Sequence, residues 1–176
     1  MNLIVIDFEV FKYNWLMCWL NLTQKTEGYI ADDVEELKRF YEEHINDLYI
    51  TFNGKGYDQW IFKGLLKGEN PYDINEWIIT EGRDGWRYSE EMTKTPLNIY
   101  DVYLGAIDRG LKELESFMGV SIHESSVDFR LDRKLTQAEI EETISYCRDD
   151  VRNTAEVFKR RAEIFNSYAN LINHFK

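Results

Sequence analysis

Features that would direct a chain into a membrane or out of the cell are missing from this sequence. Its two cysteines, Cys18 and Cys147, lie far apart and suggest no disulfide framework, which fits a reducing cytosol. No apolar run approaches the roughly 18 residues of a membrane-spanning helix. No basic segment precedes the first apolar run, and Asp7 interrupts that run early, so we expect no signal peptide. We therefore expect a cytoplasmic protein without a membrane partner.

Positive charge is also scarce. The 176 residues contain 21 Lys and Arg against 32 Asp and Glu, which gives a formal net charge of -11 at pH 7. This balance excludes a simple basic nucleic-acid-binding module, whose affinity comes from neutralising phosphates with Lys and Arg. It does not exclude an enzyme that meets phosphates through bound metal ions, because those ions are then the largest local positive charges.

The order of apolar runs predicts a single α/β domain over residues 1–176, since this length suits one well-filled core and no repeat or linker divides it. Strands are expected at 2–7, 15–22, 26–30, 48–52 and 97–103, the first three as an antiparallel meander. Helices are expected at 34–43, 57–66, 71–79, 111–118, 137–149 and 151–165. A loop or an irregular hairpin is expected at 82–95, and a surface loop at 123–134. This order favours a mixed sheet with helices on both faces.

The first strand ends in two carboxylates, Asp7 and Glu9. Side chains alternate along a strand, so these two share a face and Phe8 points to the other. Each anion disfavours ionisation of its neighbour, and a buried strand tolerates such a pair best when a cation lies between them. A divalent metal site is one interpretation, and a strand that runs out into a solvated acidic loop is the other.

Two later segments place acids in a comparable setting. Asp58 follows a strand and the turn Asn53-Gly54-Lys55-Gly56, and Tyr146 and Asp150 stand four residues apart on one helix face. Each has an ordinary alternative: Asp58 as a helix N-terminal acid, Tyr146 as a core residue and Asp150 as a cap between two helices.

Two further acids need an interpretation. Asp149 is also near the helix face of Tyr146, so it competes with Asp150 for a place in the site. Asp101 lies near the end of the last predicted strand, and a loop or cap residue is the favoured interpretation there.

The three acidic segments together resemble the motifs of the DnaQ-like, or DEDD, 3′–5′ exonucleases. Asp7-Phe8-Glu9 is similar to the D-x-E motif, Asn53 to Asp58 to the Asn-Gly-x-x-(Tyr/Phe)-Asp type of second motif, and Tyr146 to Asp150 to the Y-x-x-x-D motif of the tyrosine subclass. The resemblance runs from residue 4 to about residue 160. It implies a ribonuclease H-like fold, with a five-stranded mixed sheet flanked by helices.

The resemblance also implies a cofactor and residue roles. Four acids would hold two divalent ions, Mg²⁺ or Mn²⁺, whose preference for hard oxygen ligands suits carboxylates. By analogy, Asp7 would bridge both ions, Glu9 and Asp150 would complete the first, and Asp58 would hold the second. Tyr146 would orient the attacking water. The histidine subclass is disfavoured, because Ser145 occupies the position where its histidine would stand.

Contacts to the nucleic acid are expected within the same motifs. The candidates are Phe8, Asn53, Gly54 and Tyr57, with plain core packing as the alternative for the two aromatic residues. Val10 stands where the family usually has a threonine, so a hydroxyl contact near the 3′ end is lost.

The implied function is the removal of nucleoside monophosphates from single-stranded DNA 3′ ends, as in proofreading. The opening Ile6 to Tyr13 and the segment Tyr57 to Ile61 look most like the exonuclease domains at the N-terminus of phage-type DNA polymerases. We therefore expect a partner polymerase, as a domain or as a separate subunit, and host cytoplasm as the location if the chain is phage-encoded. An RNA-directed exonuclease of the same superfamily, and a catalytically silent module that binds single strands or partners, are the alternatives.

Overall fold

The structure, a computed structural model, describes residues 1–103, 110–113 and 126–167. Its strands form one mixed sheet in the spatial order β3-β2-β1-β4-β5. Their bounds are Leu3–Val10 (β1), Trp15–Asn21 (β2), Thr26–Ala31 (β3), Leu48–Thr51 (β4) and Ile99–Asp101 (β5). The β1–β2 and β2–β3 pairs are antiparallel, and the β1–β4 and β4–β5 pairs are parallel. The predicted α/β class and five-stranded mixed sheet are confirmed, and the arrangement is consistent with a ribonuclease H-like fold.

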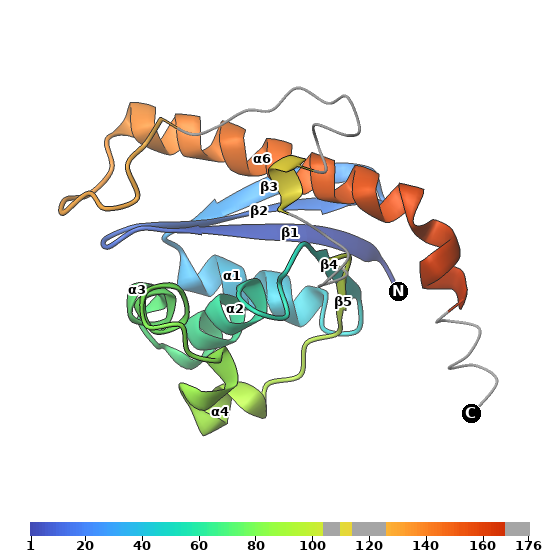
Figure 1. Ribbon diagram of the computed structural model, residues 1–176, viewed down its shortest axis with the longest axis horizontal. Coiled ribbons are helices and arrows are strands. Elements are labelled where there is room, and N and C mark those ends of the chain that lie inside the picture. Colours follow the sequence, from blue (N-terminus) through green and yellow to red (C-terminus); the bar gives the residue numbers. More distant parts are fainter. Residues whose placement is uncertain (104–109, 114–125, 168–176) are drawn as a thin grey trace.

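Helices cover both faces of the sheet (Figure 1). The long helix α6 (Gln137–Arg160) lies along one face, and α1 (Val34–Glu43) and α2 (Asp58–Lys67) lie on the other. The α2 side also carries α3 (Pro71–Asn75), the π-helical turn η1 (Glu76–Thr80), the 3-10 turn η2 (Gly85–Arg87) and α4 (Glu90–Thr93). Among the described residues, no helix is both long and apolar enough to cross a bilayer.

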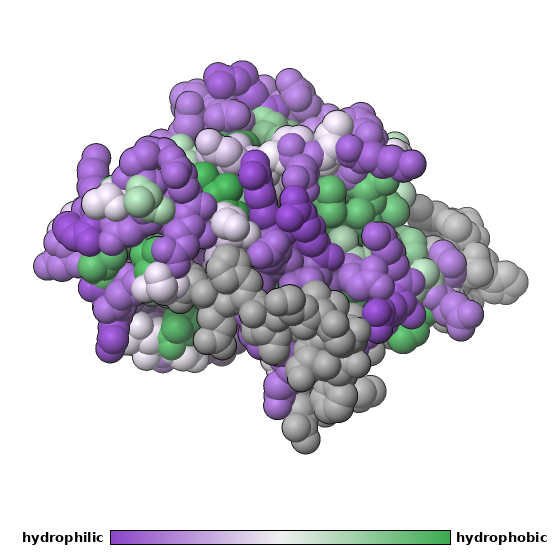
Figure 2. Space-filling view, turned by 90° about the horizontal axis from the view of Figure 1, so that it is seen from above, coloured by the Kyte–Doolittle hydropathy of each residue, from purple (hydrophilic) through white to green (hydrophobic). Residues whose placement is uncertain are grey.

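Strand β1 divides the interior into two cores. Ile4, Ile6 and Phe8 pack in the core on the α1 and α2 side, whereas Val5 packs in the core beneath α6. This period of two places Asp7 and Glu9 on the face that α6 covers. Seen from the α6 side, the surface drawn in colour is mostly hydrophilic, with smaller hydrophobic areas between (Figure 2).

Two expectations about the helices are corrected by the structure. The predicted helices at 137–149 and 151–165 form one helix across Asp149 and Asp150, followed by a separate helical segment at 162–167. One apolar stripe, which includes Cys147 and Val151, packs against the sheet on both sides of the expected break, so no boundary is needed there. The expected loop at 82–95 contains η2 and α4, because Met92 is buried in the core.

Two other predicted segments are described only in part. Residues 111–113 of the helix predicted at 111–118 are helical, and 114–118 lie outside the described residues. Residues 126–134 of the loop predicted at 123–134 contain no helix or strand, and 123–125 lie outside the described residues.

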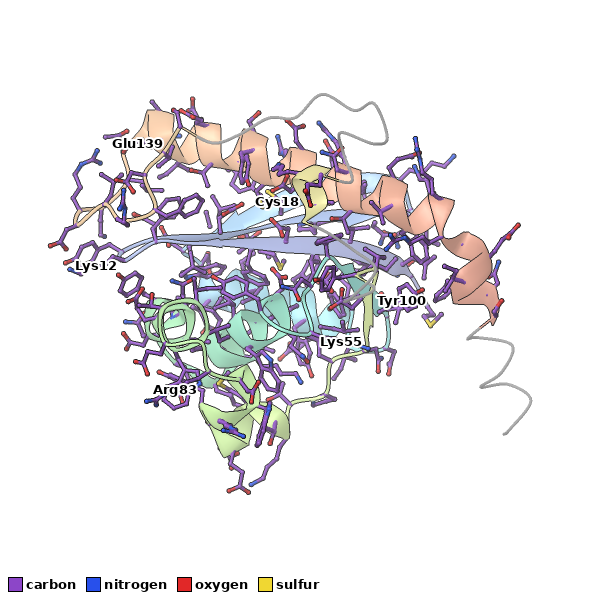
Figure 3. The ribbon with its side chains drawn as sticks, viewed as in Figure 1. Lys12, Cys18, Lys55, Arg83, Tyr100 and Glu139 are labelled. Carbon is purple, nitrogen blue, oxygen red and sulfur yellow. The ribbon has the colours of Figure 1, made fainter. Side chains whose placement is uncertain are left out.

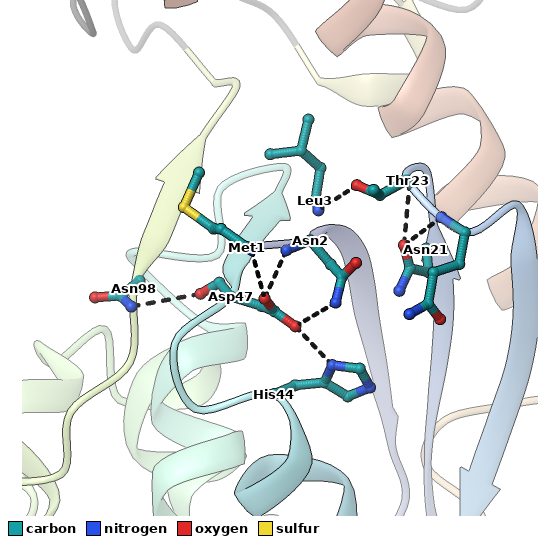
Figure 4. A network of polar contacts seen from close by, with 9 residues as sticks. Met1, Asn2, Leu3, Asn21, Thr23, His44, Asp47 and Asn98 are labelled. Atoms are coloured by element: carbon teal, nitrogen blue, oxygen red, sulfur yellow. Dashed lines mark hydrogen bonds and ion pairs between the residues drawn. The ribbon is translucent and has the colours of Figure 1, made fainter.

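The start of β1 is anchored by Asp47, which is 6% exposed (Figure 4). The Asn2 backbone N–H donates to Oδ1 at 2.5 Å, the Asn2 side-chain amide donates to Oδ2 at 2.8 Å, and His44 Nδ1 lies 2.7 Å from Oδ2. Burial alone would raise the pKa of Asp47, but these hydrogen bonds hold it below its ordinary value. Asp47 therefore fixes the parallel register of β1 beside β4.

Replacement of Asp47 by alanine is expected to lower the free energy of unfolding by about 2–4 kcal/mol, because it leaves three partly buried polar groups of Asn2 and His44 without their partner. Urea denaturation measures the change. Asp132→Ala is the control, since Asp132 is an exposed partner of Lys12 and its loss should change the stability far less than the loss of Asp47. Equal stability of the two variants would contradict the anchoring role of Asp47.

Candidate metal centre

Asp7 and Glu9 reach the centre from the middle and the end of β1. The β1 register with β2 and β4 fixes both on the α6 side of the sheet. Glu9 is 8% exposed, whereas Asp7 is half-buried. No hydrogen bond to the Glu9 carboxylate is found within residues 1–103, 110–113 and 126–167, and burial, Asp150 and Asp58 raise its pKa against the lowering effect of Lys112.

Asp58 enters the centre from the first residue of α2, directly after the glycine turn. It is 3% exposed, and its Oδ1 accepts a hydrogen bond of 3.0 Å from the backbone N–H of Phe8. Since Phe8 stands between Asp7 and Glu9, this bond ties Asp58 to the acidic end of β1. Burial raises the pKa of Asp58 to about 7, against the opposing effect of the Phe8 hydrogen bond.

Asp150 and Tyr146 reach the centre from α6. Asp150 is 7% exposed, and the Tyr146 hydroxyl hydrogen-bonds to its carboxylate. Burial and the charges of Asp150 and Glu9 hold the pKa of Tyr146 above its ordinary value, so the phenol keeps its proton at neutral pH. Asp149 instead lies 3.5 Å from Arg152 in a more exposed ion pair. The structure thus brings Asp150, rather than Asp149, toward the other acids.

Two further residues belong to the centre that the motif reasoning missed. Lys112 Nζ donates to Asp150 Oδ1 at 2.5 Å and lies 4.7 Å from the centre of the Tyr146 ring. Cys147 lies beneath Asp7, with its Sγ 3.5 Å from Asp7 Oδ2. Motif spacing could not have identified either residue. Cys147 faces the sheet because it belongs to the apolar stripe of α6 that packs in the core.

The four carboxylates share one electrostatic environment. Burial raises the pKa of Asp7 well above its usual range, and the charges of Asp58, Glu9 and Asp150 raise it further. The pKa of Glu9 is raised in the same way, first by burial and then by Asp150 and Asp58. Segments more than 40 residues apart in the sequence therefore contribute to a single cluster of repelling anions.

The donor set of this cluster fits hard divalent cations. Carboxylate oxygens are the ligands that Mg²⁺ and Mn²⁺ prefer in proteins. A bound cation would relieve the repulsion that raises these pKa values. Ligand atoms of Asp7, Glu9 and Cys147 also lie within 4.8 Å of one another, close enough to contact one ion. The residues present therefore fit a metal centre.

The turn before Asp58 is held by Asp101. The Asp101 carboxylate accepts hydrogen bonds from the backbone N–H groups of Asn53, Lys55 and Tyr103 at 2.8–3.0 Å. Asp101 is the last residue of β5, so the loop expectation is corrected, whereas the cap expectation agrees with these hydrogen bonds. Asn53 adopts a φ of 61°, and a Cβ at Gly54 would lie only 2.3 Å from Thr51 Oγ1, so the turn approaches β4 too closely for any larger residue.

The predicted nucleic-acid contacts lie beside the acids in two different settings. Phe8 is buried and packs on Trp15 and Phe62, on the opposite face of β1 from Asp7. The Tyr57 hydroxyl donates to Asn75 Oδ1 at 2.7 Å. Both residues nevertheless border a cavity. Binding of nucleic acid by Phe8, Asn53, Gly54 and Tyr57 stays a prediction.

That cavity, of about 380 Å³, opens beside Glu9. Its walls come from β1, α3, η1 and the loop before α6, and they include Tyr57, Tyr72, Phe129 and Arg130. Aromatic side chains and a cation next to a carboxylate cluster are a suitable setting for one nucleotide.

Comparisons with known proteins support the fold. No protein-family model matches this sequence, and no curated protein matches it. Among solved structures, the chain is similar to Phi29 DNA polymerase complexed with primer-template DNA, with a TM-score of 0.55 over 92% of this chain. The two sequences are 13% identical, so the likeness concerns the fold alone, and this chain spans 31% of the length of that chain.

Proposed function

We propose that this chain is a metal-dependent 3′–5′ exonuclease that removes nucleoside monophosphates from DNA 3′ ends. The observation that carries the proposal is that Asp7 and Glu9 offer ligand atoms close enough to contact one ion, at a site where Asp58 and Asp150 are near enough for their charges to raise the pKa of Asp7. Tyr146 hydrogen-bonds to Asp150 beside them. The likeness to a DNA polymerase fold supports a nucleic-acid-related role, and it agrees with the resemblance of the motifs to polymerase exonuclease domains.

The reaction is hydrolysis of the last phosphodiester. Water attacks phosphorus, the 3′ oxygen of the preceding nucleotide leaves, and a nucleoside 5′-monophosphate is released. Two bound divalent ions would stabilise the attacking and leaving oxygens of such an in-line displacement. The four carboxylates would hold these ions. Tyr146 would orient the water through its protonated phenol, which Asp150 holds in place.

The cavity beside Glu9 is the proposed position of the terminal nucleotide. Tyr57 and Ile79 line both this cavity and a second one of about 300 Å³. The second cavity adds the half-exposed Trp86 and the cations Lys55 and Arg83, both of which lie on the α2 side of the sheet (Figure 3). We propose that the next nucleotides of the strand follow this aromatic and cationic path away from the metal centre.

The proposed partner is a DNA polymerase, either as a domain of a longer chain or as a separate subunit. This chain spans 31% of the length of the Phi29 DNA polymerase chain, which is compatible with a polymerase activity that resides outside these 176 residues.

Digestion of matched DNA and RNA oligonucleotides, labelled at the 5′ end, tests the function. With Mg²⁺ or Mn²⁺, we expect the DNA to shorten stepwise from its 3′ end, and EDTA should stop the reaction. Faster shortening of RNA would replace the DNA assignment by the RNA-directed alternative. Binding without digestion under both metals would favour the silent module, and digestion that survives EDTA would overturn the metal mechanism.

A further inference from the structure

Cys147 adds sulfur to a site that otherwise offers oxygen. Its side chain is fully buried between α6 and the sheet, and its Sγ lies 3.5 Å from both the backbone oxygen and Oδ2 of Asp7. The thiol is not part of the carboxylate motifs. Soft thiolate ligands select different metals from hard carboxylate ligands, so the thiol changes which cations this centre can hold.

The geometry around Cys147 suits zinc-like coordination. A tetrahedral ion with a metal–sulfur bond of about 2.3 Å and a metal–oxygen bond of about 2.0 Å separates the two ligand atoms by about 3.5 Å. The separation between Cys147 Sγ and Asp7 Oδ2 has this value. The ligand atoms of Glu9 complete a set of three that lie within 4.8 Å of one another, so one ion could contact all three residues.

Glu9 supplies the independent observation that a ligand belongs here. Its side chain is more than nine-tenths buried, and its carboxylate accepts no hydrogen bond in the part of the chain that the structure describes. Buried carboxylates are normally paired or coordinate a metal.

We propose that Asp7, Glu9 and the Cys147 thiolate bind a thiophilic divalent cation of the Zn²⁺ and Cd²⁺ class. The thiol proton passes to solvent as the metal–sulfur bond forms. Because Asp7 and Glu9 are shared, this cation competes with Mg²⁺ or Mn²⁺ for the centre. The proposal rests on the proposed function only in using the same two carboxylates, and it requires no hydrolysis.

The chain offers a matched control in Cys18. This second thiol is also fully buried beneath α6 (Figure 3), but its Sγ donates to the backbone oxygen of Ile144 at 3.7 Å. Cys18 also lies close to the centre, because it is the cross-strand partner of Asp7 and its thiol hydrogen-bonds with that of Cys147. Among the described residues, however, only the Cys147 thiol lies within 4.8 Å of ligand atoms of both Asp7 and Glu9, so Cys18→Ala tests whether Cys147 alone supplies the sulfur.

Titration of the reduced, metal-free protein with Cd²⁺ tests the proposal through the ultraviolet charge-transfer band of a cadmium–thiolate bond. We expect the band in the wild type and in Cys18→Ala at one equivalent of Cd²⁺, and no band in Cys147→Ser. Calorimetry should show Zn²⁺ affinity at least about tenfold weaker in Cys147→Ser, since loss of an indirect ligand contact already costs about that much. Absence of the band in the wild type, or its survival in Cys147→Ser, overturns the proposal.

Two measurements keep these outcomes interpretable. Circular dichroism and an unchanged Mn²⁺-induced thermal shift establish that Cys147→Ser is folded with its carboxylates in place, and Cys147→Ala provides a second variant without sulfur. A charge-transfer band in a protein without nuclease activity would support the thiolate site while the exonuclease proposal fails. Nuclease activity without a band would give the opposite result.

Discussion

Asp7→Asn is expected to abolish 3′-end cleavage and, in the absence of metal, to make the protein more stable. Asp7 is the acid whose pKa all three other carboxylates raise, after burial itself. The neutral amide removes that repulsion and also replaces a carboxylate that would hold the proposed metal ions by a weaker, uncharged ligand. Cleavage should fall on the order of 10³-fold or more. The thermal midpoint without metal should rise by about 3–6 °C, which corresponds to about 1–2 kcal/mol for a domain of this size.

A gain in stability together with loss of activity separates this variant from one that is simply misfolded. Single-turnover digestion of a labelled DNA strand and thermal unfolding in EDTA measure the two effects. Asp149→Asn is the matched control, because Asp149 lies on the same helix but forms an ion pair with Arg152 outside the cluster. Activity of Asp7→Asn within tenfold of the wild type, or a lower thermal midpoint, would remove Asp7 from the proposed role.

The sequence predicted those parts of the site that depend on local periodicity. Alternation along β1 was sufficient to place Asp7 and Glu9 on one face, and helical spacing was sufficient to pair Tyr146 with Asp150. The same local reasoning was wrong at Asp149 and Asp150, where two adjacent acids resembled a boundary between helices. The packing of Val151 and Phe158 on the sheet continues the helix through them.

Contacts between distant segments could not be predicted in the same way. The bond from Phe8 to Asp58 joins residues 50 positions apart, and the contact of Lys112 with Asp150 joins residues 38 apart. No local pattern encodes such partners, because tertiary packing decides which of many acids and cations meet. Asp58 was identified because it belongs to a motif that resembles the family. Lys112 and Cys147 belong to no such motif, so the sequence did not indicate them.

The metal-free protein should lose stability as the pH rises from about 4 to about 8, and saturating Mn²⁺ should cancel that loss. Burial raises the pKa of Asp58 to about 7 in the folded protein, and the pKa values of Asp7 and Glu9 are raised in the same direction. The unfolded chain releases these protons near pH 4. Between these limits the folded state binds more protons than the unfolded state, so stability falls as the pH rises.

Asp47 works in the opposite sense, because its pKa is lowered in the folded protein. Its contribution to stability is present above about pH 4 and is lost as the pH falls further. The loss of stability below pH 4 and the loss between pH 4 and pH 8 therefore have different causes.

A divalent ion takes the place of the bound protons in the carboxylate cluster, and the Mn²⁺-induced rise in thermal midpoint should therefore be larger at about pH 8 than at about pH 5. Asp58→Asn keeps an acceptor for the Phe8 N–H and should flatten the pH dependence without metal. Thermal unfolding at both pH values, once with Mn²⁺ and once with EDTA, gives the four thermal midpoints that this comparison needs. An equal Mn²⁺ shift at both pH values would show that the four acids do not form the coupled centre proposed for this chain.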